Sequence, residues 1–502
     1  MPAINIIGSY QDPLNLDQGA GKLVNVRIVP RAKQENKPAQ VRFVGSPGLT
    51  QVCAPTASPC IAVGIALETV WSGHANGNIY YNVNTNAPTL AGTVDVNPTQ
   101  PVIRFAEDRT ALCIASNANT NNPAENGTGY TATPAAGVVN AGFDASINFD
   151  PSTVAELNNI TIWSGASNFY ASQDSKMYSS QPLQPANVLA NSFATKEARA
   201  DKVVDLAISG LVMWPLGSRS LEQWYNPGGQ TDFAFTAYPN SLYSVGLAAR
   251  LSLAVLRDVI VFVATDRRIW SCVGQTAQQI SPPWIDLLLQ QLTVAQLSAL
   301  TAYAYGQGGS DFYVLTLPGQ WSLEYSSTSG VWSYRQSPGG RLDHAGRCAV
   351  EDDGGITYVG LDTGQICTVN INSASEPAGT LSRLMLTPWV GGAAGSLISA
   401  GTDGETSRQT FDTLDVTSSM GPQAGNFQLD WSDTTDVTVN GIIVSNRTWR
   451  GLRQIQLPAP GQKRGIARNM GTGRRRQFRL QYSGAQAPFT IDELFLNVTP
   501  GN

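Results

Sequence analysis

Phe312-Tyr313-Val314-Leu315-Thr316-Leu317-Pro318-Gly319-Gln320-Trp321-Ser322-Leu323-Glu324-Tyr325 is the stretch that decides the fold of this chain. Its first half is an apolar run of aromatic and β-branched residues, which is typical of a buried β-strand. Pro-Gly then marks a tight turn, and a second aromatic strand follows it. Val331-Trp332 begins a third strand after another short turn. The stretch therefore predicts a small antiparallel sheet with tight connections.

The same pattern recurs along most of the chain. Its apolar strands begin near residues 70, 112, 160, 211, 259, 312 and 356. The spacing is roughly 40–50 residues, which is the length of one propeller blade. Stacking blades around an axis buries both faces of each sheet, so we predict an all-β chain with a β-propeller of six or seven blades over residues 41–384. The alternative is two separate β-sandwiches.

The pattern changes near Leu381, and the Gly-rich stretch Gly391–Gly395 follows. Beyond it, long segments alternate apolar and polar residues with period two, as half-buried strands do. These segments include Phe427–Trp431, Phe478–Tyr482 and Phe489–Val498. We therefore predict a C-terminal β-sandwich over residues 385–502.

Two further segments differ from the repeat. Residues 1–40 contain Pro30 and the polar run Arg31–Lys37, which predicts an N-terminal extended arm. Thr293 and Gln296 have the spacing of a capping box, and Leu292 and Leu297 fit the hydrophobic staple beside it. We expect one short inserted helix to begin there.

Composition agrees with an all-β fold. Of 502 residues, 42% are hydrophobic and only 14% are charged, whereas a typical soluble chain has roughly 25% charged residues. The apolar stretch Leu251–Ala264 is interrupted by Arg257 and Asp258, so we expect no membrane insertion. The N-terminus lacks a basic region followed by an apolar run, so we expect no secretory signal. The six cysteines are scattered and fit small core residues of a protein made in a cytoplasm. Cys53 and Cys60 are close enough in sequence to bridge under oxidation, but nothing in the sequence requires it.

Charge is unevenly distributed along the chain. The net charge is −5, yet Val437–Thr490 contains ten Lys or Arg residues and no Asp or Glu. The remainder therefore carries a net charge of −15. An acidic body with a basic C-terminal region indicates self-assembly by charge complementarity, or one face turned towards an anion.

Five arginines in this region are candidate channel or subunit-interface residues: Arg468, Arg474, Arg475, Arg476 and Arg479. Consecutive strand residues point to opposite faces, so the run 474–476 cannot direct all its side chains to one ligand. The alternative interpretation places these arginines on the solvated face of sandwich strands, or against an acidic neighbouring subunit.

Residue types that carry catalysis or bind metals are sparse. The two histidines, His74 and His344, are far apart in sequence, which disfavours a zinc site or a Ser-His-Asp triad, and we expect His74 to lie in a solvated turn. Gly19-Ala20-Gly21-Lys22 lacks the spacing of a phosphate-binding loop. Glu351-Asp352-Asp353-Gly354 lacks the alternating ligands of a calcium loop and predicts an acidic turn. We expect no enzyme activity, no cofactor and no metal.

Two other functions remain as alternatives. One is a β-propeller scaffold that binds peptides or proteins. The other is a propeller glycosidase, which would need converging carboxylates. Ser432-Asp433-Thr434 is faintly similar to the Asp-containing turns of sialidases, but it lies beyond the predicted ring and lacks the Gly and Trp that should follow.

Several short segments, taken in order, resemble the packaged-DNA stabilisation proteins of podoviruses, the tail-hub or nozzle subunits of short-tailed bacteriophages. They are Leu23–Arg27, Ser46-Pro47-Gly48-Leu49, Ser218–Tyr225, the helix opening at Thr293, Phe312–Pro318 with Leu323–Tyr325 and Val331-Trp332, and Gly473–Phe478 with Leu480. The chain departs from the family pattern at Ser326, where the family has Asp, and at Gly309-Ser310-Asp311, where it has Gly-His.

The resemblance implies a structural role in the virion tail, with assembly in the host bacterial cytoplasm. It implies a homohexameric ring below the portal and the adaptor, or head-to-tail connector, protein. The ring would carry a tail fibre, tailspike, needle or plug, seal the packaged double-stranded DNA and form the conduit for its ejection. A net-acidic ring is compatible with this role because it repels DNA and lets it slide.

Overall fold

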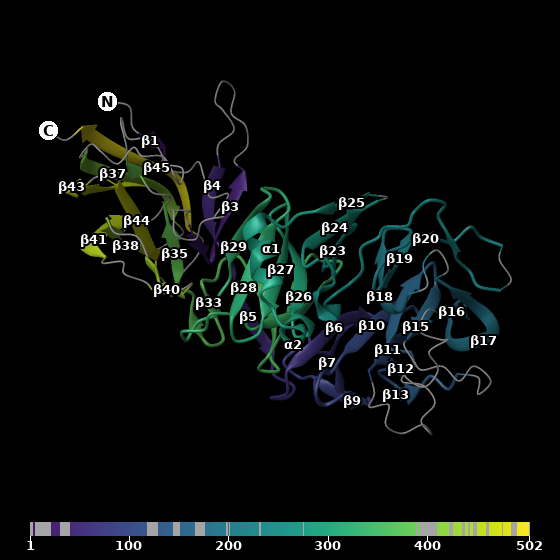
Figure 1. Cartoon of the computed structure of the whole chain (residues 1–502). Helices are drawn as coiled ribbons and strands as arrows, with labels where there is room; N and C mark the ends of the chain where they lie inside the picture. The colour runs from purple at the N-terminus through teal and green to yellow at the C-terminus, as the bar shows by residue number, and fades with distance from the viewer. Residues whose placement is uncertain are drawn as a thin grey trace.

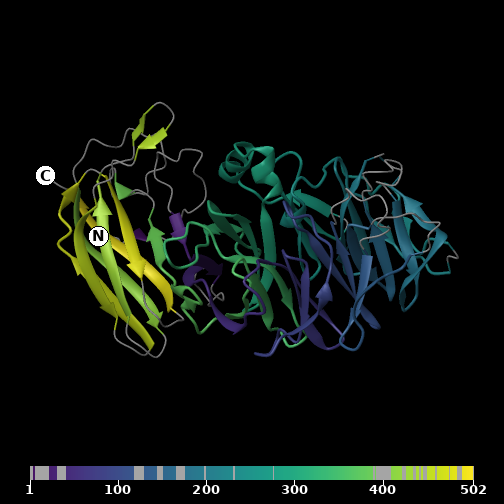
Figure 2. The ribbon, with the colours of Figure 1, turned by 90° about the horizontal axis from the view of Figure 1, so that it is seen from below.

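The structure is a computed structural model in which residues 4–5, 22–30, 41–117, 129–143, 151–165, 176–196, 199, 201–229, 232–274, 276–387, 390–391, 409–420, 425–433, 437–439, 442–444, 449–457, 461–473, 475–482 and 489–500 are described. The secondary-structure elements of this part of the chain are almost all β-strands, arranged as a propeller and a sandwich (Figure 1). Figure 2 shows the sandwich, in yellow and light green, beside the propeller.

Seven four-stranded antiparallel blades make up the propeller in the described part of the chain. Blades 1 to 4 are β6–β9 (Cys60–Ala66, Thr69–His74, Asn78–Tyr81, Thr89–Thr93), β10–β13 (Ile103–Asp108, Ala111–Ser116, Gly129–Thr133, Gly137–Asn140), β14–β17 (Thr153–Leu157, Ile160–Ser164, Lys176–Gln181, Gln184–Thr195) and β18–β21 (Val203–Ser209, Val212–Gly217, Trp224–Tyr225, Thr236–Ala237). Blades 5 and 6 are β22–β25 (Ala254–Leu256, Val259–Val263, Ile269–Val273, Thr276–Gln279) and β26–β29 (Thr301–Gln307, Ser310–Leu317, Trp321–Ser326, Val331–Tyr334). Blade 7 combines β30–β32 (Gly346–Glu351, Thr357–Leu361, Ile366–Asn370) with β5 (Gly48–Cys53). The first strands of successive blades are neighbours all the way around the ring.

The prediction of a propeller is confirmed, and the blade count is seven. Each repeat position found in the sequence falls at the second strand of a blade, from β7 to β31. These strands are apolar on both faces because each blade is packed between two others. In blade 2, for example, Leu112 packs against blade 1, whereas the next residue, Cys113, packs against blade 3. Period-two alternation therefore distributes side chains to two neighbouring blades.

Strand β5 closes the propeller. It precedes blade 1 in sequence but pairs with β32 of blade 7, with Leu49 opposite Val369. The outer edge of the last blade is thus covered by the strand that leads into the first blade, and the ring is closed by backbone hydrogen bonds.

The sandwich has two sheets around one apolar core. One sheet has the order β2 (Lys22–Val24), β35 (Arg383–Leu386), β44 (Arg475–Tyr482), β38 (Gly425–Ser432), β41 (Arg450–Leu457), with β36 (Val390–Gly391) on β44. The other has the order β3 (Val26–Pro30), β4 (Val41–Gly45), β45 (Phe489–Pro500), β37 (Gln409–Met420), β42 (Gly461–Arg468), with β1 (Ile4–Asn5) on β45 and β43 (Thr472–Gly473) on β37. Two small hairpins, β33–β34 (Ser375–Glu376, Gly379–Thr380) and β39–β40 (Val437–Val439, Ile442–Val444), lie outside both sheets.

The described strands of residues 22–30 differ from the predicted extended arm. β2 pairs with β35 of the sandwich and also with β29 of blade 6, so the sheet of blade 6 continues into the sandwich. β3 pairs with β4, which in turn pairs with β45. These strands bury Leu23, Val26 and Ile28 in the sandwich core, which explains why they are ordered. The polar run Arg31–Lys37 lies outside the described residues.

Two α-helices, rather than one, connect blades 5 and 6 in the described structure. The predicted helix is α2 (Val294–Ser298), and its capping box is present: Gln296 N donates to Thr293 Oγ1 at 3.2 Å and Thr293 N donates to Gln296 Oε1 at 2.9 Å. The additional helix is α1 (Pro283–Gln290), which follows the last strand of blade 5. A short 3-10 helix, η3 (Arg250–Ser252), lies just before the first strand of that blade. Both helices pack on the apolar core between these two blades.

Candidate functional surfaces

The two histidines are buried structural groups. His74 ends β7 with no exposed surface, its Nε2 lies 3.0 Å from Ser72 Oγ and its Nδ1 lies 3.0 Å from the Ser58 carbonyl oxygen. The expectation that His74 lies in a solvated turn was wrong, because the Gly- and Asn-rich turn begins one residue later. Burial lowers the pKa of His74, so its imidazole is held neutral.

His344 belongs to a buried network where blades 6 and 7 meet the sandwich. Its Nε2 lies 3.1 Å from Glu376 Oε1, and Gly346 N donates to its Nδ1 at 3.1 Å. Burial lowers the pKa of His344 despite the opposing effect of Glu376. Arg335 completes the network: it lies 3.5 Å from Glu376 and 3.9 Å from Glu324.

This network also forms hydrogen bonds with Ser46 and Pro47, which precede the closing strand β5. Arg335 Nη2 donates to the carbonyl of Pro47, Arg383 Nη2 donates to the carbonyl of Ser46 at 3.0 Å, and Ser46 Oγ donates to Glu324 at 3.2 Å. These groups are all buried. The Ser46-Pro47 segment is therefore a structural junction between the two units.

One end of the propeller is acidic. Because all blades share one topology, the turns between first and second strands all lie at this end. Exposed or half-buried acidic residues there come from six blades: Glu68, Glu107, Glu156, Asp258, Asp311, Glu351, Asp352 and Asp353. Burial and the nearby Asp353 carboxylate raise the pKa of Glu107, which indicates that carboxylates of different blades approach one another.

The segment Glu351-Asp352-Asp353-Gly354 is the turn between β30 and β31, as predicted. Glu351 Oε2 accepts a hydrogen bond from Gly306 N of blade 6 at 3.1 Å. This bond links the end of β30 to the end of β26 in the neighbouring blade. Among the described residues, no cluster of three or more His, Cys, Asp or Glu has the arrangement of a metal site. Likewise, no helix in that part of the chain is long and apolar enough to cross a membrane.

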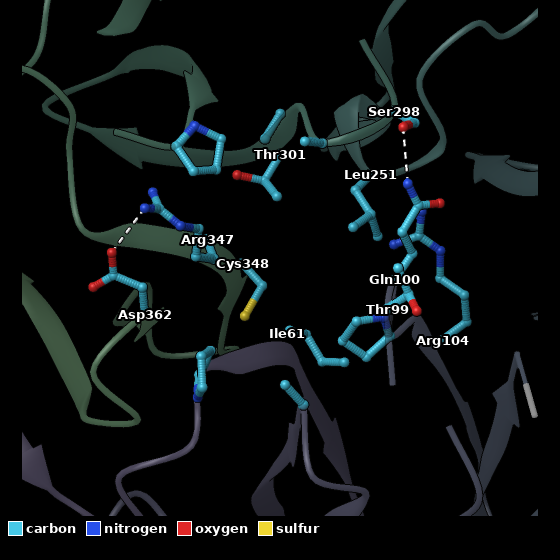
Figure 3. A pocket seen from close by; sticks show the side chains of 16 residues that line it. Ile61, Thr99, Gln100, Arg104, Leu251, Ser298, Thr301, Arg347, Cys348 and Asp362 are labelled. Atoms are coloured by element: carbon cyan, nitrogen blue, oxygen red, sulfur yellow. Dashed lines mark hydrogen bonds and ion pairs between the residues drawn. The ribbon is translucent and has the colours of Figure 1, made fainter. Parts of the chain in front are cut away.

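The opposite end of the propeller axis contains a pocket of about 450 Å³ (Figure 3). Its walls come from the starts of β6, β10, β26 and β30 and from η3, and they include Ile61, Leu251 and Cys348. Its two arginines are already paired. Arg347 donates to Asp362 at 2.8 Å, and Arg104 donates to Asp205 at 2.8 Å. The pocket is thus largely apolar, with neutralised charges at its rim.

Five arginines were predicted to line a channel or an interface, and the three with described side chains, Arg468, Arg476 and Arg479, do not form one site. Arg476 is 2% exposed, lies over the rings of Phe411 and Trp431, and donates to both carboxylate oxygens of Asp433 at 2.7 and 2.8 Å. It therefore serves the sandwich core and is not accessible to DNA or to another subunit. The same contact gives Asp433 a structural role, because its carboxylate binds Arg476. Its faint similarity to a sialidase turn therefore needs no catalytic explanation.

Of the other four arginines, Arg468 and Arg479 have described side chains. Arg479 is half-buried, pairs with Asp430 at 2.8 Å and lies over the ring of Trp449. Arg468 is exposed at the end of β42. Arg475 begins β44, and neither its side chain nor Arg474 is among the described parts of the chain. A channel or interface role stays a prediction for Arg468, Arg474, Arg475 and Arg479.

The sandwich has a basic edge, which the basic composition of the C-terminal region indicates but does not locate. β41 and β42 are the last strands of the two sheets and are neighbours. They expose Arg450, Arg453, Arg464 and Arg468, together with Leu452 and Ile466. Only Arg468 of this set was singled out from the sequence, because the others are isolated in it and come together through the pairing of distant strands.

Comparison with known protein families identifies the chain. Residues 24–370 match the family described as Bacteriophage P22 Gp10, beta-propeller. The chain belongs to this family. It is thus a phage structural protein with a propeller fold, and a component of the virion. The matched range runs from β2 through β32, so it includes both the closing strand and all seven blades.

Similarity outside the family is weak. No relative was found among the curated proteins. Among solved structures, a streptogramin B lyase is 8% identical, with a TM-score of 0.38, over 69% of this chain and 98% of its own. BamB from Moraxella catarrhalis is 11% identical, with a TM-score of 0.36, over 70% of this chain and 97% of its own. The computationally designed Ika8 protein is 12% identical, with a TM-score of 0.39, over 64% of this chain and 100% of its own. Similarity at this level carries no information about the function of this chain.

Proposed function

We propose that this chain is the non-enzymatic tail hub, or nozzle, subunit of a short-tailed bacteriophage. Six copies form a ring below the portal and adaptor, seal the packaged double-stranded DNA and provide the conduit for its ejection. The observation that carries the proposal is membership of the phage Gp10 propeller family over residues 24–370. The ordered family segments along the chain provide further support.

The charge distribution supports a closed ring of identical subunits. The acidic end of the propeller and the basic edge of the sandwich lie on different units of one chain, so they can meet between neighbouring copies. Such a head-to-tail contact uses two different surfaces and closes into a ring when the rotation between copies is suitable. Charge complementarity gives the contact its orientation and partner choice.

The proposed conduit also agrees with the overall charge of the chain. A net-acidic ring repels phosphate and prevents the tight, salt-dependent binding that would retain DNA. Paired arginines, such as Arg104 and Arg347, have their charge neutralised within the chain. The net charge of −5 is compatible with a surface over which DNA slides.

The proposal is tested by assembling the purified chain with the adaptor ring of the same phage. We expect six-fold particles of this chain attached to the adaptor in electron micrographs. A stable monomer that adds no density to the adaptor would contradict the tail-hub role and would favour a propeller scaffold that binds peptides or proteins. Phage lacking the gene should package DNA and then lose it.

The proposed subunit contact is tested by charge reversal. The double variant Arg453→Glu and Arg468→Glu should weaken ring formation, and Glu107→Lys with Asp353→Lys in the same chain should restore it. Arg219→Glu, which reverses an exposed charge between β19 and β20, away from both the basic edge and the acidic turns, is the control. Unchanged rings in the first double variant would remove the basic edge from the interface but leave the tail-hub role intact.

A further inference from the structure

Two cysteine sulfurs meet at the seam between the first and last blades. Cys60 lies on β6, the first strand of blade 1, and Cys348 lies on β30, the first strand of blade 7. Their Sγ atoms are 3.7 Å apart. Cys60 has no exposed surface, whereas Cys348 is half-buried and lines the pocket at the end of the propeller axis (Figure 3).

The backbone around the two sulfurs has features that bring them together. Both strands have a register irregularity next to the cysteine, between Cys60 and Ala62 and between Gly346 and Cys348. Such bulges redirect side chains. Gly360 of β31 lies opposite Cys348, and a Cβ atom there would be 2.4 Å from Cys60 Sγ and 2.8 Å from Cys348 Sγ. Only glycine leaves space for both sulfur atoms at this position.

We propose that Cys60 and Cys348 are the site of an oxidative cross-link that closes the propeller covalently. A disulfide has an S–S length of about 2.05 Å, so the sulfurs must approach by a further shift of under about 2 Å. Side-chain rotation with a small strand adjustment supplies a shift of this size. The inference concerns the propeller alone and goes beyond the proposed tail-hub function.

The pocket gives a route for the oxidant, which is a small-molecule disulfide such as oxidised glutathione. The Cys348 thiolate attacks one sulfur of the oxidant, forms a mixed disulfide and releases one thiolate. Cys60 Sγ then attacks Cys348 Sγ, the mixed disulfide breaks, and the proton of Cys60 leaves with the second thiol. Two protein thiols are oxidised and one small disulfide is reduced to two thiols. Burial raises the pKa of Cys60 well above its usual range, so Cys348, which is half-buried and lines the pocket, is the thiol that reacts first.

The cross-link would reinforce a seam that otherwise depends on packing and on the hydrogen bonds of β5. It would join the first strands of blades 1 and 7 and thus constrain all the blades between them in the unfolded chain. The thiols would stay reduced in a cytoplasm and become oxidised outside the cell. A particle released from its host would therefore gain a more stable propeller.

The experiment treats the full-length chain with oxidised glutathione and maps its disulfides by mass spectrometry without reduction. We expect a Cys60–Cys348 peptide pair, about 2 Da lighter than the two thiol peptides together, and an increase in the denaturant midpoint that dithiothreitol reverses. Cys348→Ser should abolish both effects, whereas Cys272→Ser, which removes a buried cysteine in blade 5, should retain them.

Three outcomes would overturn the proposal: a stable glutathione adduct on Cys348 with a free Cys60, a bond between Cys60 and Cys53, or no change in either thiol. Wild-type protein alone decides between these outcomes, because differential alkylation before and after oxidation reports each cysteine separately. The result therefore does not depend on the folding of the Cys348→Ser variant or on ring assembly.

Discussion

Asn25 and Gln336 are joined by two reciprocal hydrogen bonds between the N-terminal strands and the end of blade 6. Asn25 Nδ2 donates to the Gln336 carbonyl, and the Gln336 backbone N–H donates to Asn25 Oδ1, both at 2.9 Å. Asn25 Nδ2 also donates to the carbonyl of Ser382 at 2.8 Å. The side chain is 2% exposed, and the residue has a φ of +53°, a conformation that asparagine tolerates well. One amide thus holds three distant segments together.

Asn25→Ala should strongly destabilise the chain. Alanine removes three hydrogen bonds to the backbone of Gln336 and Ser382 at a partly buried junction, and each hydrogen bond contributes about 1 kcal/mol. We expect a loss of about 3 kcal/mol in the free energy of unfolding, measured by urea denaturation. Asn240→Ala is the matched control, because Asn240 has a φ of +59° but is exposed. Equal losses in the two variants would show that backbone conformation, and not the buried amide, sets the effect.

Gly48→Ala should open the closing strand of the propeller. A Cβ atom at Gly48 would lie 2.3 Å from the Ser375 carbonyl oxygen and 2.9 Å from that of Ser373. Both are backbone atoms of the segment that follows β32, so the start of β5 and that segment must move apart. We expect destabilisation of about 3 kcal/mol, as for overpacked sites, together with faster amide exchange in blade 7.

The control for Gly48→Ala is Gly354→Ala, where the nearest atom belongs to the flexible side chain of Asp352 at 3.2 Å. That variant should lose less than about 1 kcal/mol. If Gly48→Ala kept native exchange rates in blade 7, β5 would not be needed for closure.

Local sequence patterns predicted the blades well because each second strand is buried on both faces and is bounded by tight turns. They did not predict which strand completes blade 7, since the pairing of β5 with β32 joins residues more than 300 positions apart. The same limit applies to β2 and β3. Pro30 and the polar residues after it predict an arm, whereas burial of Val26 and Ile28 in a distant sandwich decides the structure.

Contacts between residues that are distant in sequence also decide where the candidate site residues lie. The run 474–476 predicts solvated arginines, but Asp433 and the Phe411 ring, both distant in sequence, provide a buried site for Arg476. Helix α1 begins at Pro283, and a proline suggests a break in a sequence pattern. In the first turn of a helix, however, the missing N–H is not needed. Sequence spacing alone suggested Cys53 as a partner for Cys60, whereas blade closure brings Cys348 beside it.

Arg335→Met should lower the free energy of unfolding, because it removes a buried positive charge at the propeller–sandwich junction. Methionine keeps much of the side-chain volume but leaves Glu324 and Glu376 buried without this cation. Breaking a buried ion pair by removing one partner costs about 3–5 kcal/mol, and we expect a loss in that range in chemical denaturation. Arg257→Met is the control, because its ion pair with Asp311 is 59% exposed on the arginine side and should contribute less than about 1 kcal/mol. A similar small change in both variants would mean that the junction tolerates unpaired carboxylates.

The two buried histidines should make the chain less stable as the pH falls below about 6.5. Burial lowers the pKa of both His74 and His344 below the ordinary value of 6.5, so the unfolded chain binds protons first. Their contribution is therefore fully present above pH 6.5 and is lost as the pH falls through each folded-state pKa. Glu376 also has a lowered pKa: burial opposes its ionisation, but the hydrogen bond with His344 and the charge of Arg335 outweigh that effect. Its contribution is present above about pH 4.5 and is lost only in stronger acid.

Urea midpoints measured from pH 8 to pH 5 test this assignment. Each histidine should add a slope of up to about 1.4 kcal/mol per pH unit to the free energy of unfolding. His344→Gln retains a donor towards Glu376, and His74→Gln serves as the matched variant in blade 1. Each should flatten the pH dependence, and the double variant should flatten it most, whatever its stability at pH 8. An unchanged slope in the double variant would show that other groups cause the acid sensitivity in this range.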